Sequence, residues 1–363
     1  MKIHISSSES SDSDNAPSEN SGPACILVAN ANDPSGAGGL TSDIATVISV
    51  GGHSVSIVTG SYIKDTTEIF DHFSFDGEAV AEQARVALED LQVQAIKIGF
   101  VGSPENIAAL AEVTSDYAQL PVVSYMPNLS WWHGERIDQY LDAFQAMMLP
   151  QTTVLVGNHS TLWRWLLPDW SNDASPTARD LAAAAAEHGT PYTLVTGIPQ
   201  PEQFVENVLA SPHTVLCSSR FELFDATFTG AGDTLSAALA ALIGCGCDLP
   251  EACSEALSYL DRCLDAGFRP GMGHVVPDRM FWAEPEEDSE EEKEDRAEDG
   301  QGGADNDNDN DNDSAAPVDS EDQTAQDRAA MGMPAAMPSS PLGTDIELPS
   351  LDGFVLPHHD TKH

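Results

Sequence analysis

The chain contains few basic residues for its length. Its 363 residues include 15 Lys and Arg but 59 Asp and Glu, and the formal net charge is -44. A protein with this charge repels polyanions, so the composition argues against nucleic-acid binding and against docking on an anionic membrane. The sequence also has no apolar run long enough to cross a bilayer and no apolar signal region after Met1. We therefore expect a soluble protein of the cytoplasm.

Familiar metal-binding and nucleotide-binding motifs are also missing. The six cysteines follow no spacing typical of a zinc site, and we interpret them as buried thiols in a reducing cytosol. The sequence has no GxxxxGK[ST] loop. Residues 36–39 are rich in glycine and follow an apolar run, but Thr41 stands where the dinucleotide fingerprint needs its third glycine. These absences argue against a P-loop and against a dinucleotide fold.

The composition divides the chain into three segments. Residues 1–22 are polar and rich in serine, and residues 283–363 carry 24 acidic and 4 basic residues. Such segments bury too little apolar surface to offset the entropy of ordering, so we predict two disordered tails. Apolar residues return between 346 and 356, where the chain could dock on a partner or on the core. Residues 23–282 are long enough for one sizeable domain.

Short apolar runs alternate with amphipathic segments throughout this domain. The expected strands are 25–29, 55–59, 95–99, 122–125, 153–156, 192–196 and two that start at Val215 and Phe221. The expected helices are 41–50, 78–91, 104–113, 139–148, 181–188, 235–243 and 250–266. The alternation predicts an α/β fold with a mostly parallel sheet and helices on both faces. Ligands bind such sheets outside the carboxyl ends of the strands, where the glycine-bearing loops 30–39 and 229–233 both fall.

The turn before the helix at 235–243 carries the clearest chemical signal. Its small residues allow backbone amides to converge on one point, and the helix start adds the positive end of its dipole. A phosphate held there would lie beside Asp233. An anion site with an adjacent carboxylate suits phosphoryl transfer to a hydroxyl group. The alternative is a glycine-containing turn that Thr229 or Asp233 merely caps.

The sequence of the first loop suggests a family. Residues 32–40 read NDPSGAGGL and are followed by Asp43. This resembles, with a small change in glycine order, the DPSGGAG signature of hydroxymethylpyrimidine/phosphomethylpyrimidine kinases in the ribokinase superfamily. The Gly230 turn stands where that superfamily has its GxGD or GxGC anion hole. The resemblance covers residues 25–282 and implies a ribokinase-like fold. It also implies that ATP and Mg²⁺ are used to phosphorylate a hydroxymethyl aminopyrimidine, its monophosphate, or both, in thiamine biosynthesis.

The resemblance also implies roles for individual residues. Asp233 would be the base, and the backbone amides of Gly230, Ala231 and Gly232 would form the anion hole. The ATP-binding residues would be Asn158, Thr196 and Gly197. The residues facing the acceptor would be Ala31, Gly38, Asp43, Lys64 and Phe100. Two of these have a structural alternative, since Asp43 could be a carboxylate in the first turn of a helix and Phe100 could be a core residue.

Three departures from the family pattern leave alternatives open. Ser124 and Thr161 replace carboxylates that would sit near the magnesium, so no metal ligand is assigned. Lys64, which only donates hydrogen bonds, replaces a usual glutamine that also accepts them. The lysine makes a pyridoxal kinase the first alternative. The lost carboxylates make a catalytically impaired ligand-binding or regulatory protein the second. Relatives suggest a homodimer.

Overall fold

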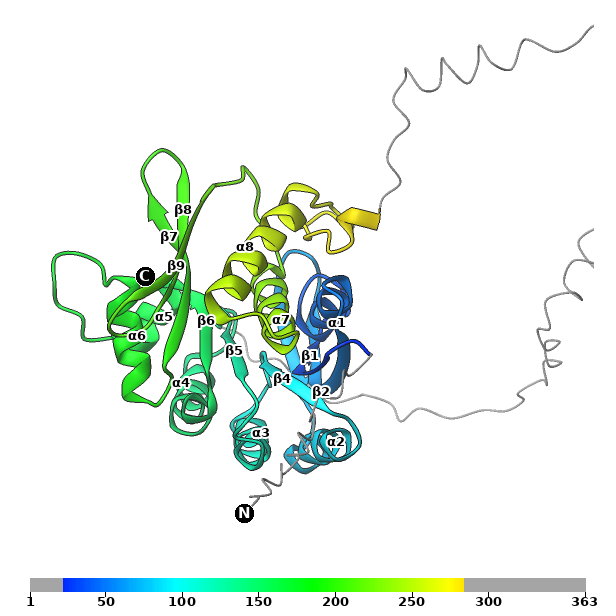
Figure 1. Cartoon of the computed structure of the whole chain (residues 1–363). Coiled ribbons are helices and arrows are strands. Elements are labelled where there is room, and N and C mark those ends of the chain that lie inside the picture. The colour runs from blue at the N-terminus through cyan, green and yellow to red at the C-terminus, as the bar shows by residue number, and fades with distance from the viewer. Residues whose placement is uncertain (1–21, 284–363) are drawn as a thin grey trace, which may run out of the picture. The chain divides into compact units, whose positions relative to one another are not determined.

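A nine-stranded sheet forms the centre of the computed structural model, which describes residues 22–283 (Figure 1). The predictions for residues 1–22 and 283–363 therefore lie outside the described residues, apart from residues 22 and 283. In spatial order the strands are β3 (Ile69–Ser74), β2 (His53–Lys64), β1 (Cys25–Asn32), β4 (Val93–Ile98), β5 (Val122–Met126), β6 (Val154–Asn158), β7 (Tyr192–Gln200), β8 (Phe204–Ala210) and β9 (Val215–Glu222). The six strands from β2 to β7 pair in parallel, while β3, β8 and β9 are antiparallel at the edges.

Helices cover both faces of this sheet, as predicted. On one face lie α1 (Gly39–Ser49), α7 (Ala231–Gly244) and α8 (Leu249–Asp265) (Figure 1). On the other lie α2 (Gly77–Asp90), α3 (Pro104–Asp116), α4 (Gly134–Ala143), α5 (His159–Leu166) and α6 (Ala178–Glu187). In β1, Ile26 and Val28 pack into the first layer, and Leu27 packs into the second. The strand is a continuous apolar run because both of its faces are buried.

The sequence missed elements at the edges of the sheet. It did not predict β3 or β8, and it expected two strands where the structure has the single strand β9. The edge strands β3 and β9 are largely exposed and tolerate polar residues such as Ser218 and Ser219, so their apolar signal is weak. This reason does not apply to β8, which lies between β7 and β9 and is buried at residues 207–210. The sequence also missed α5, an eight-residue helix whose N-cap is Asn158. The predicted helix at 139–148 ends in a π-helical segment, Phe144–Met148, that continues α4.

The two glycine-bearing loops lie against each other at the carboxyl end of the parallel strands. Gly230 is the N-cap of α7 and has a left-handed backbone with φ of 89°. A side chain at this position would collide with the carbonyl oxygen of Ala37 in the β1–α1 loop. Glycine is therefore required for the two loops to pack this closely, and the start of α7 is brought to the start of α1.

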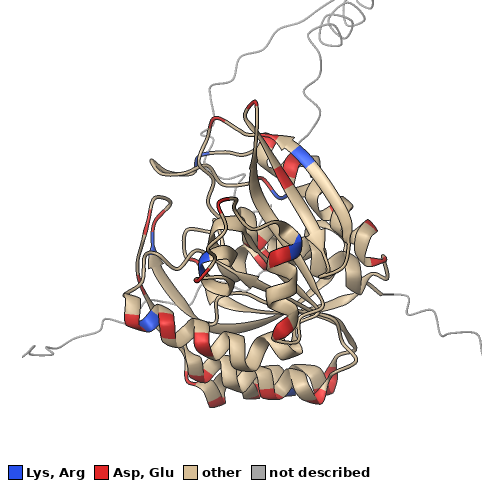
Figure 2. Cartoon of the chain, turned by 90° about the vertical axis from the view of Figure 1, so that its left-hand side faces the viewer, with Lys and Arg blue, Asp and Glu red and all other residues tan. Residues whose placement is uncertain are grey.

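The described domain shares the acidic character of the whole chain. Residues 23–282 contain 31 acidic and 10 basic residues. Figure 2 shows acidic positions on several of the surface helices and few basic ones. Within residues 22–283, no helix has both the length and the apolar character needed to cross a membrane.

Candidate active site

Asp33 organises the loop between β1 and α1. Its Oδ1 accepts hydrogen bonds from the amide of Ser35 at 2.9 Å and from the hydroxyl of Ser35 at 2.6 Å. Its Oδ2 accepts a hydrogen bond from the amide of Gly38 at 2.7 Å. The side chain is fully buried. One carboxylate thus fixes the loop conformation that places Gly38 and Gly39 opposite α7.

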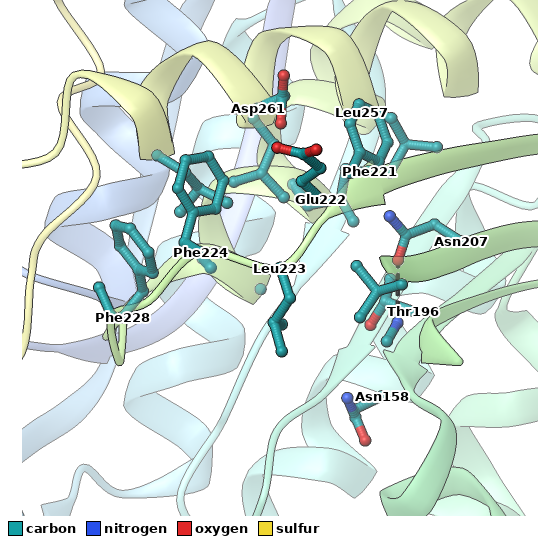
Figure 3. A pocket seen from close by; sticks show the side chains of 18 residues that line it. Asn158, Thr196, Asn207, Phe221, Glu222, Leu223, Phe224, Phe228, Leu257 and Asp261 are labelled. Carbon is teal, nitrogen blue, oxygen red and sulfur yellow. Dashed lines mark hydrogen bonds between the residues drawn. The ribbon is translucent and has the colours of Figure 1, made fainter. Parts of the chain in front are cut away.

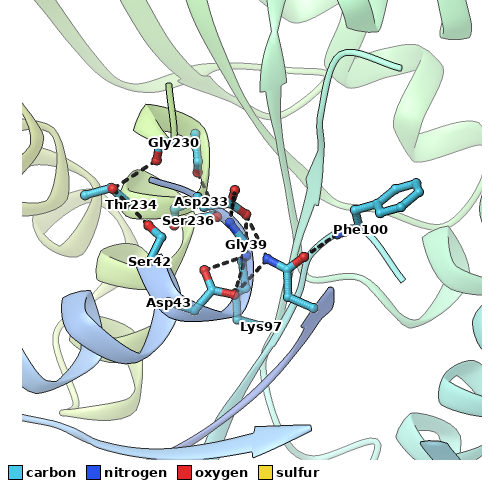
Figure 4. Close-up of polar contacts among 12 residues, drawn as sticks. Gly39, Ser42, Asp43, Lys97, Phe100, Gly230, Asp233, Thr234 and Ser236 are labelled. Carbon is cyan, nitrogen blue, oxygen red and sulfur yellow. Dashed lines mark hydrogen bonds and ion pairs between the residues drawn. The ribbon is translucent and has the colours of Figure 1, made fainter. Parts of the chain in front are cut away.

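Asp233 lies in the first turn of α7 and faces this loop (Figure 4). Its Oδ2 accepts a hydrogen bond from the amide of Gly39 at 2.9 Å. Its Oδ1 accepts hydrogen bonds from Asn30 Nδ2 at 2.9 Å and from Lys97 Nζ at 3.0 Å. Burial acts to raise the pKa of Asp233, but Lys97 and the hydrogen-bond donors outweigh it, so the pKa lies below its ordinary value. The side chain is an ionised carboxylate that remains 17% exposed.

Lys97 connects Asp233 to a second carboxylate. It projects from β4, is completely buried, and lies 2.7 Å and 2.8 Å from the two carboxylate oxygens of Asp43. Asn30 Nδ2 also donates to Asp43 Oδ2 at 2.9 Å. Burial raises the pKa of Asp43 to about 6, and the ammonium of Lys97 offsets only part of this effect. These four side chains, Asn30, Asp43, Lys97 and Asp233, form what we call the carboxylate network.

The structure corrects the two readings of Asp43. It is the fifth residue of α1, and the first turn of that helix contains no acidic residue, so the first-turn alternative is wrong. The residue is fully buried, and its oxygens accept hydrogen bonds from Lys97 and Asn30 inside the protein. Its place in the network explains why a carboxylate stands there.

Two other predicted acceptor residues are also enclosed. Ala31 is fully buried in β1, where its amide donates to the carbonyl oxygen of Phe100 at 2.9 Å. The ring of Phe100 is 1% exposed. It stacks on Tyr62 at a centroid distance of 5.3 Å and meets Trp131 and Trp132 edge-on. Packing accounts for Phe100, as the alternative interpretation held.

The remaining acceptor residues, Gly38 and Lys64, lie at the junction of the two loops. A Cβ atom on Gly38 would come within 3.2 Å of Asp233 Oδ2 and 3.4 Å of Asp33 Oδ2. Lys64 Nζ lies 2.8 Å from Asp33 Oδ2 and 3.4 Å from Thr229 Oγ1. The structure thus brings Gly38, Lys64 and Asp233 together.

The predicted ATP-binding residues share a separate cavity of about 220 Å³ beside the start of α7 (Figure 3). Asn158, Thr196 and Gly197 line it together with Ala231 and Gly232 of the turn. Aromatic and apolar side chains, including Phe221, Leu223, Phe224, Phe228 and Leu257, form much of the remaining wall. None of its 18 lining residues is Lys or Arg. The cavity offers backbone groups and apolar surface, and its lining also includes the carboxylates of Glu222 and Asp261.

The positions expected near a metal do not form a metal site. The hydroxyl of Ser124 is buried and hydrogen-bonded to Thr152 Oγ1 at 2.7 Å. Thr161 lines a different groove, with Arg164 and Trp165. Residues 22–283 contain no group of three or more His, Cys, Asp or Glu side chains that could hold a metal ion. Asp33, Asp43 and Asp233 all accept hydrogen bonds from protein donors, so the side chains present do not fit a protein-held Mg²⁺.

Sequence reasoning missed Asn30, Asp33, Lys97 and Arg279. Nε of Arg279 donates to Thr234 Oγ1 at 3.0 Å, and its terminal nitrogens donate to the carbonyl oxygens of Gly36 and Ala37. This guanidinium therefore ties α7 to the β1–α1 loop. Lys97 had a signal, because a lone charge in the buried strand 95–99 needs a buried partner. Arg279 had no such signal, because it lies in a segment without regular secondary structure and outside the motifs described above.

Comparisons with known proteins identify the family of this chain. Residues 33–278 match the family model of phosphomethylpyrimidine kinase. The hydroxymethylpyrimidine/phosphomethylpyrimidine kinase of Mycobacterium leprae (strain TN) is 26% identical over 278 residues, which cover 73% of this chain and 97% of that protein. The protein of the same name from Streptomyces coelicolor is 26% identical over 264 residues, which cover 72% of this chain and 96% of that protein.

Solved structures confirm the predicted fold class. An ADP complex of Bacillus subtilis pyridoxal kinase has a TM-score of 0.64 at 19% identity and covers 72% of this chain and 98% of its own. A phosphomethylpyrimidine kinase from Clostridium difficile has a TM-score of 0.56 at 18% identity and covers 66% of this chain and 99% of its own. At these identities the likeness concerns the fold. The family model and the curated relatives carry the assignment: this chain belongs to the phosphomethylpyrimidine kinase family.

Proposed function

We propose that this protein transfers the γ-phosphate of ATP to 4-amino-5-hydroxymethyl-2-methylpyrimidine, to its monophosphate, or to both, in thiamine biosynthesis. The observation that carries the proposal is the position of Asp233. It stands in the first turn of α7, between the cavity lined by Ala231 and Gly232 and the loop that holds Gly38.

The two oxygens of Asp233 have different surroundings, and this suggests which one is the base. Oδ1 accepts hydrogen bonds from two donors, Asn30 and Lys97, while Oδ2 accepts one from the amide of Gly39. Oδ2 therefore keeps lone-pair capacity for the proton of an incoming hydroxyl group. As the acceptor oxygen forms its bond to the γ-phosphorus, the bond from that phosphorus to the β,γ-bridging oxygen breaks. ADP leaves, and the hydroxyl proton passes to Oδ2.

The turn at residues 229–233, which we call the anion turn, and the adjacent cavity would bind the nucleotide. The amides of Ala231 and Gly232 belong to the first turn of α7, where backbone N–H groups have no partner within the helix. They are suited to bind the oxygens of the transferring phosphoryl group. Asn158, Thr196 and Gly197 would bind the rest of ATP. We propose that Mg²⁺ enters with the nucleotide phosphates, because the carboxylates of the site are held by protein donors.

The test is Asp233→Asn, assayed by ADP release with the aminopyrimidine alcohol, its monophosphate and pyridoxal. We expect kcat to fall by about a thousandfold because the general base is lost, while ATP still binds. Asp142→Asn changes an exposed carboxylate on α4 and serves as the matched control. Turnover by Asp233→Asn equal to that of the control would refute the assigned base.

A pyridoxal kinase is the second candidate, and Lys64 is the observation that favours it. A competition assay between the pyrimidine alcohol and pyridoxal distinguishes the two, because the true acceptor has the higher kcat/KM. An absence of turnover with every acceptor, combined with measurable binding, would instead support a ligand-binding or regulatory protein.

We also propose a cytoplasmic homodimer. The edge strand β3 supports self-association, since Phe70 and Phe73 are 58% and 65% exposed on it. Light scattering coupled to size-exclusion chromatography measures the mass of the particle in solution. A monomer at micromolar concentration would contradict this part of the proposal.

A further inference from the structure

An ammonium group joins the two loops of the candidate active site. Lys64, the last residue of β2, places Nζ 2.8 Å from Asp33 Oδ2 and 3.4 Å from Thr229 Oγ1. Thr229 directly precedes the Gly230 turn. The side chain of Lys64 is 8% exposed, and that of Asp33 is fully buried. The positive charge is therefore held beside the start of α7 before a ligand binds.

We propose that Lys64 is a catalytic residue that contacts the phosphoryl group during its transfer. The inference rests on the proposed function and moves Lys64 from the acceptor side to the phosphoryl side of the site. The γ-phosphorus gains the acceptor oxygen and loses the bridging oxygen of ADP, and Asp233 Oδ2 takes the hydroxyl proton. Lys64 stays protonated throughout and stabilises the negative charge on the oxygens of the transferring group.

The position of Gly38 locates the ammonium relative to the base. A Cβ atom on Gly38 would lie 3.2 Å from Asp233 Oδ2, 3.4 Å from Asp33 Oδ2 and 3.4 Å from the Cα of Gly230. The base, the carboxylate that holds Lys64 and the anion turn therefore surround one point. Residue 38 is buried and its surroundings leave little room for a side chain, so a glycine lets these three groups pack closely together.

Two neighbouring cations are committed to other partners. Lys97 is fully buried and pairs with Asp43 and with Asp233, so its charge is used to hold these two carboxylates. The guanidinium of Arg279 donates to two backbone carbonyl oxygens and to Thr234 Oγ1. No Lys or Arg lines the nucleotide cavity among the described residues. Lys64 is thus the cation placed to meet the transferring group at the turn.

The absence of carboxylates at positions 124 and 161 suggests a specific role for the ammonium of Lys64. Ser124 and Thr161 provide no carboxylate to anchor a metal ion, and the three aspartates of the site are engaged by protein donors. The negative charge on a phosphoryl group that is being transferred still requires a positive charge nearby to stabilise it. Lys or Arg supplies this charge in many kinases. A lysine fixed by Asp33 supplies it without a protein-held metal ion.

The hairpin that carries Lys64 is itself anchored. In the turn after β2, Thr66 Oγ1 accepts a hydrogen bond from the amide of Gly273 at 3.1 Å, and its carbonyl oxygen accepts one from the amide of His274 at 2.9 Å. Contacts two residues from Lys64 therefore restrict its backbone. Such fixed charges stabilise a transition state without reorganising during the reaction.

The experiment compares the wild-type protein with Lys64→Met, Lys64→Arg and Lys64→Met/Asp33→Asn. The double variant removes both charges, so it tests the loss of the ammonium without leaving Asp33 buried and unpaired. Asp33→Asn alone keeps the ammonium but removes the carboxylate that orders the β1–α1 loop, so it measures how much of the loss in the double variant comes from that loop. Steady-state ADP release gives kcat and the acceptor KM. Calorimetry with ADP and with β,γ-methylene-ATP, both without Mg²⁺, measures nucleotide binding independently of any acceptor.

In both variants that lack the ammonium, we expect kcat to fall by about a hundredfold or more and the acceptor KM to change little. The affinity for β,γ-methylene-ATP should fall about tenfold, because the lost contact is to the γ-phosphoryl group, while the affinity for ADP stays within twofold. Lys64→Arg keeps the charge and should recover part of kcat.

A raised acceptor KM with unchanged kcat would overturn the inference and return Lys64 to the acceptor side. Equal losses of ADP and β,γ-methylene-ATP affinity would also overturn it, because the γ-phosphoryl contact would not be specific. A wild-type protein that binds neither nucleotide and releases no ADP would refute the proposed function itself, which separates the two failures.

Discussion

The two halves of the candidate active site are built from opposite kinds of side chain. The half beneath Asp233 is polar and buried, and its charges are paired within 3.0 Å of one another. The half that would face the nucleotide is a cavity lined mostly by aromatic and aliphatic side chains, and it includes the carboxylates of Glu222 and Asp261 but no basic residue. Under the proposed function, this contrast would concentrate charge where the phosphoryl group moves, while the rest of the nucleotide would meet largely apolar surface.

This difference has an energetic consequence. A charge in the polar half has no water to replace a lost partner, so each member depends on the others. Most side chains that line the cavity are apolar, so truncating one of them leaves no buried charge without a partner. Substitutions in the polar half should therefore damage the fold and the reaction together, whereas substitutions in the cavity should mainly weaken nucleotide binding.

The largest effect is expected for Lys97→Met. This change leaves Asp43 buried without its cation and removes one donor from Asp233. We expect the free energy of unfolding to fall by about 3–5 kcal/mol, as when one partner of a buried ion pair is removed. Urea denaturation measures this change.

An exposed ion pair provides the control. Arg85 and Glu112 lie 2.7 Å apart, with side chains 37% and 71% exposed, so Arg85→Met should cost less than about 1 kcal/mol. A loss of under 1 kcal/mol for Lys97→Met would show that the polar half is no more cooperative than the surface.

The sequence predicted those parts of the site that are contiguous in the chain. The loop at 32–40 and the turn at 228–234 were found because their glycines and aspartates lie together, and the alternation of elements predicted that both loops share one edge of the sheet. The residues lining the nucleotide cavity at Asn158, Thr196 and Gly197 came from motif positions, and the structure places them together.

The carboxylate network could not be predicted in the same way. Asn30 and Asp233 are 203 positions apart, and Lys97 and Asp233 are 136 apart, so no local pattern joins them. Asp43 was assigned to the acceptor because its position matches one that the family resemblance implies, and not because of its surroundings in the fold. Only the folded structure shows that Lys97 of β4 reaches both Asp43 of α1 and Asp233 of α7. Phe100 was ambiguous for a similar reason, since its aromatic neighbours come from four different segments.

A smaller effect is expected on the nucleotide side, from Phe224→Ala. Phe224 lines the cavity and meets Phe228 edge-on at a centroid distance of 5.5 Å (Figure 3). We expect the KM for ATP to rise about tenfold through lost apolar contact, with kcat nearly unchanged and with a loss of unfolding free energy under about 1 kcal/mol. Steady-state kinetics at saturating acceptor separates the two constants.

Val86→Ala truncates an apolar side chain on α2 that is 63% exposed, and it should change neither constant. A fall in kcat for Phe224→Ala as large as that for Asp233→Asn would contradict the expectation that substitutions in the cavity mainly weaken nucleotide binding.

The smallest effect concerns the dependence of stability on pH. Burial raises the pKa of Asp43 to about 6 in the folded protein, from an ordinary value of 3.8. Between about pH 4 and pH 6 the folded state therefore binds more protons at Asp43 than the unfolded state does. This carboxyl group favours the folded state fully below that range, and its contribution is lost as the pH rises through 6.

Asp43→Asn removes that titration. Its free energy of unfolding, plotted against pH between 4 and 6, should have a slope more positive than the wild-type slope by up to about 1.4 kcal/mol per pH unit. Urea denaturation at several pH values measures both slopes, and Asp142→Asn should reproduce the wild-type slope because that side chain is exposed. Identical slopes for Asp43→Asn and the wild type would mean that Lys97 holds Asp43 fully ionised. Asp43 would then keep its negative charge throughout this range, and the charges of the polar half would not change with pH there.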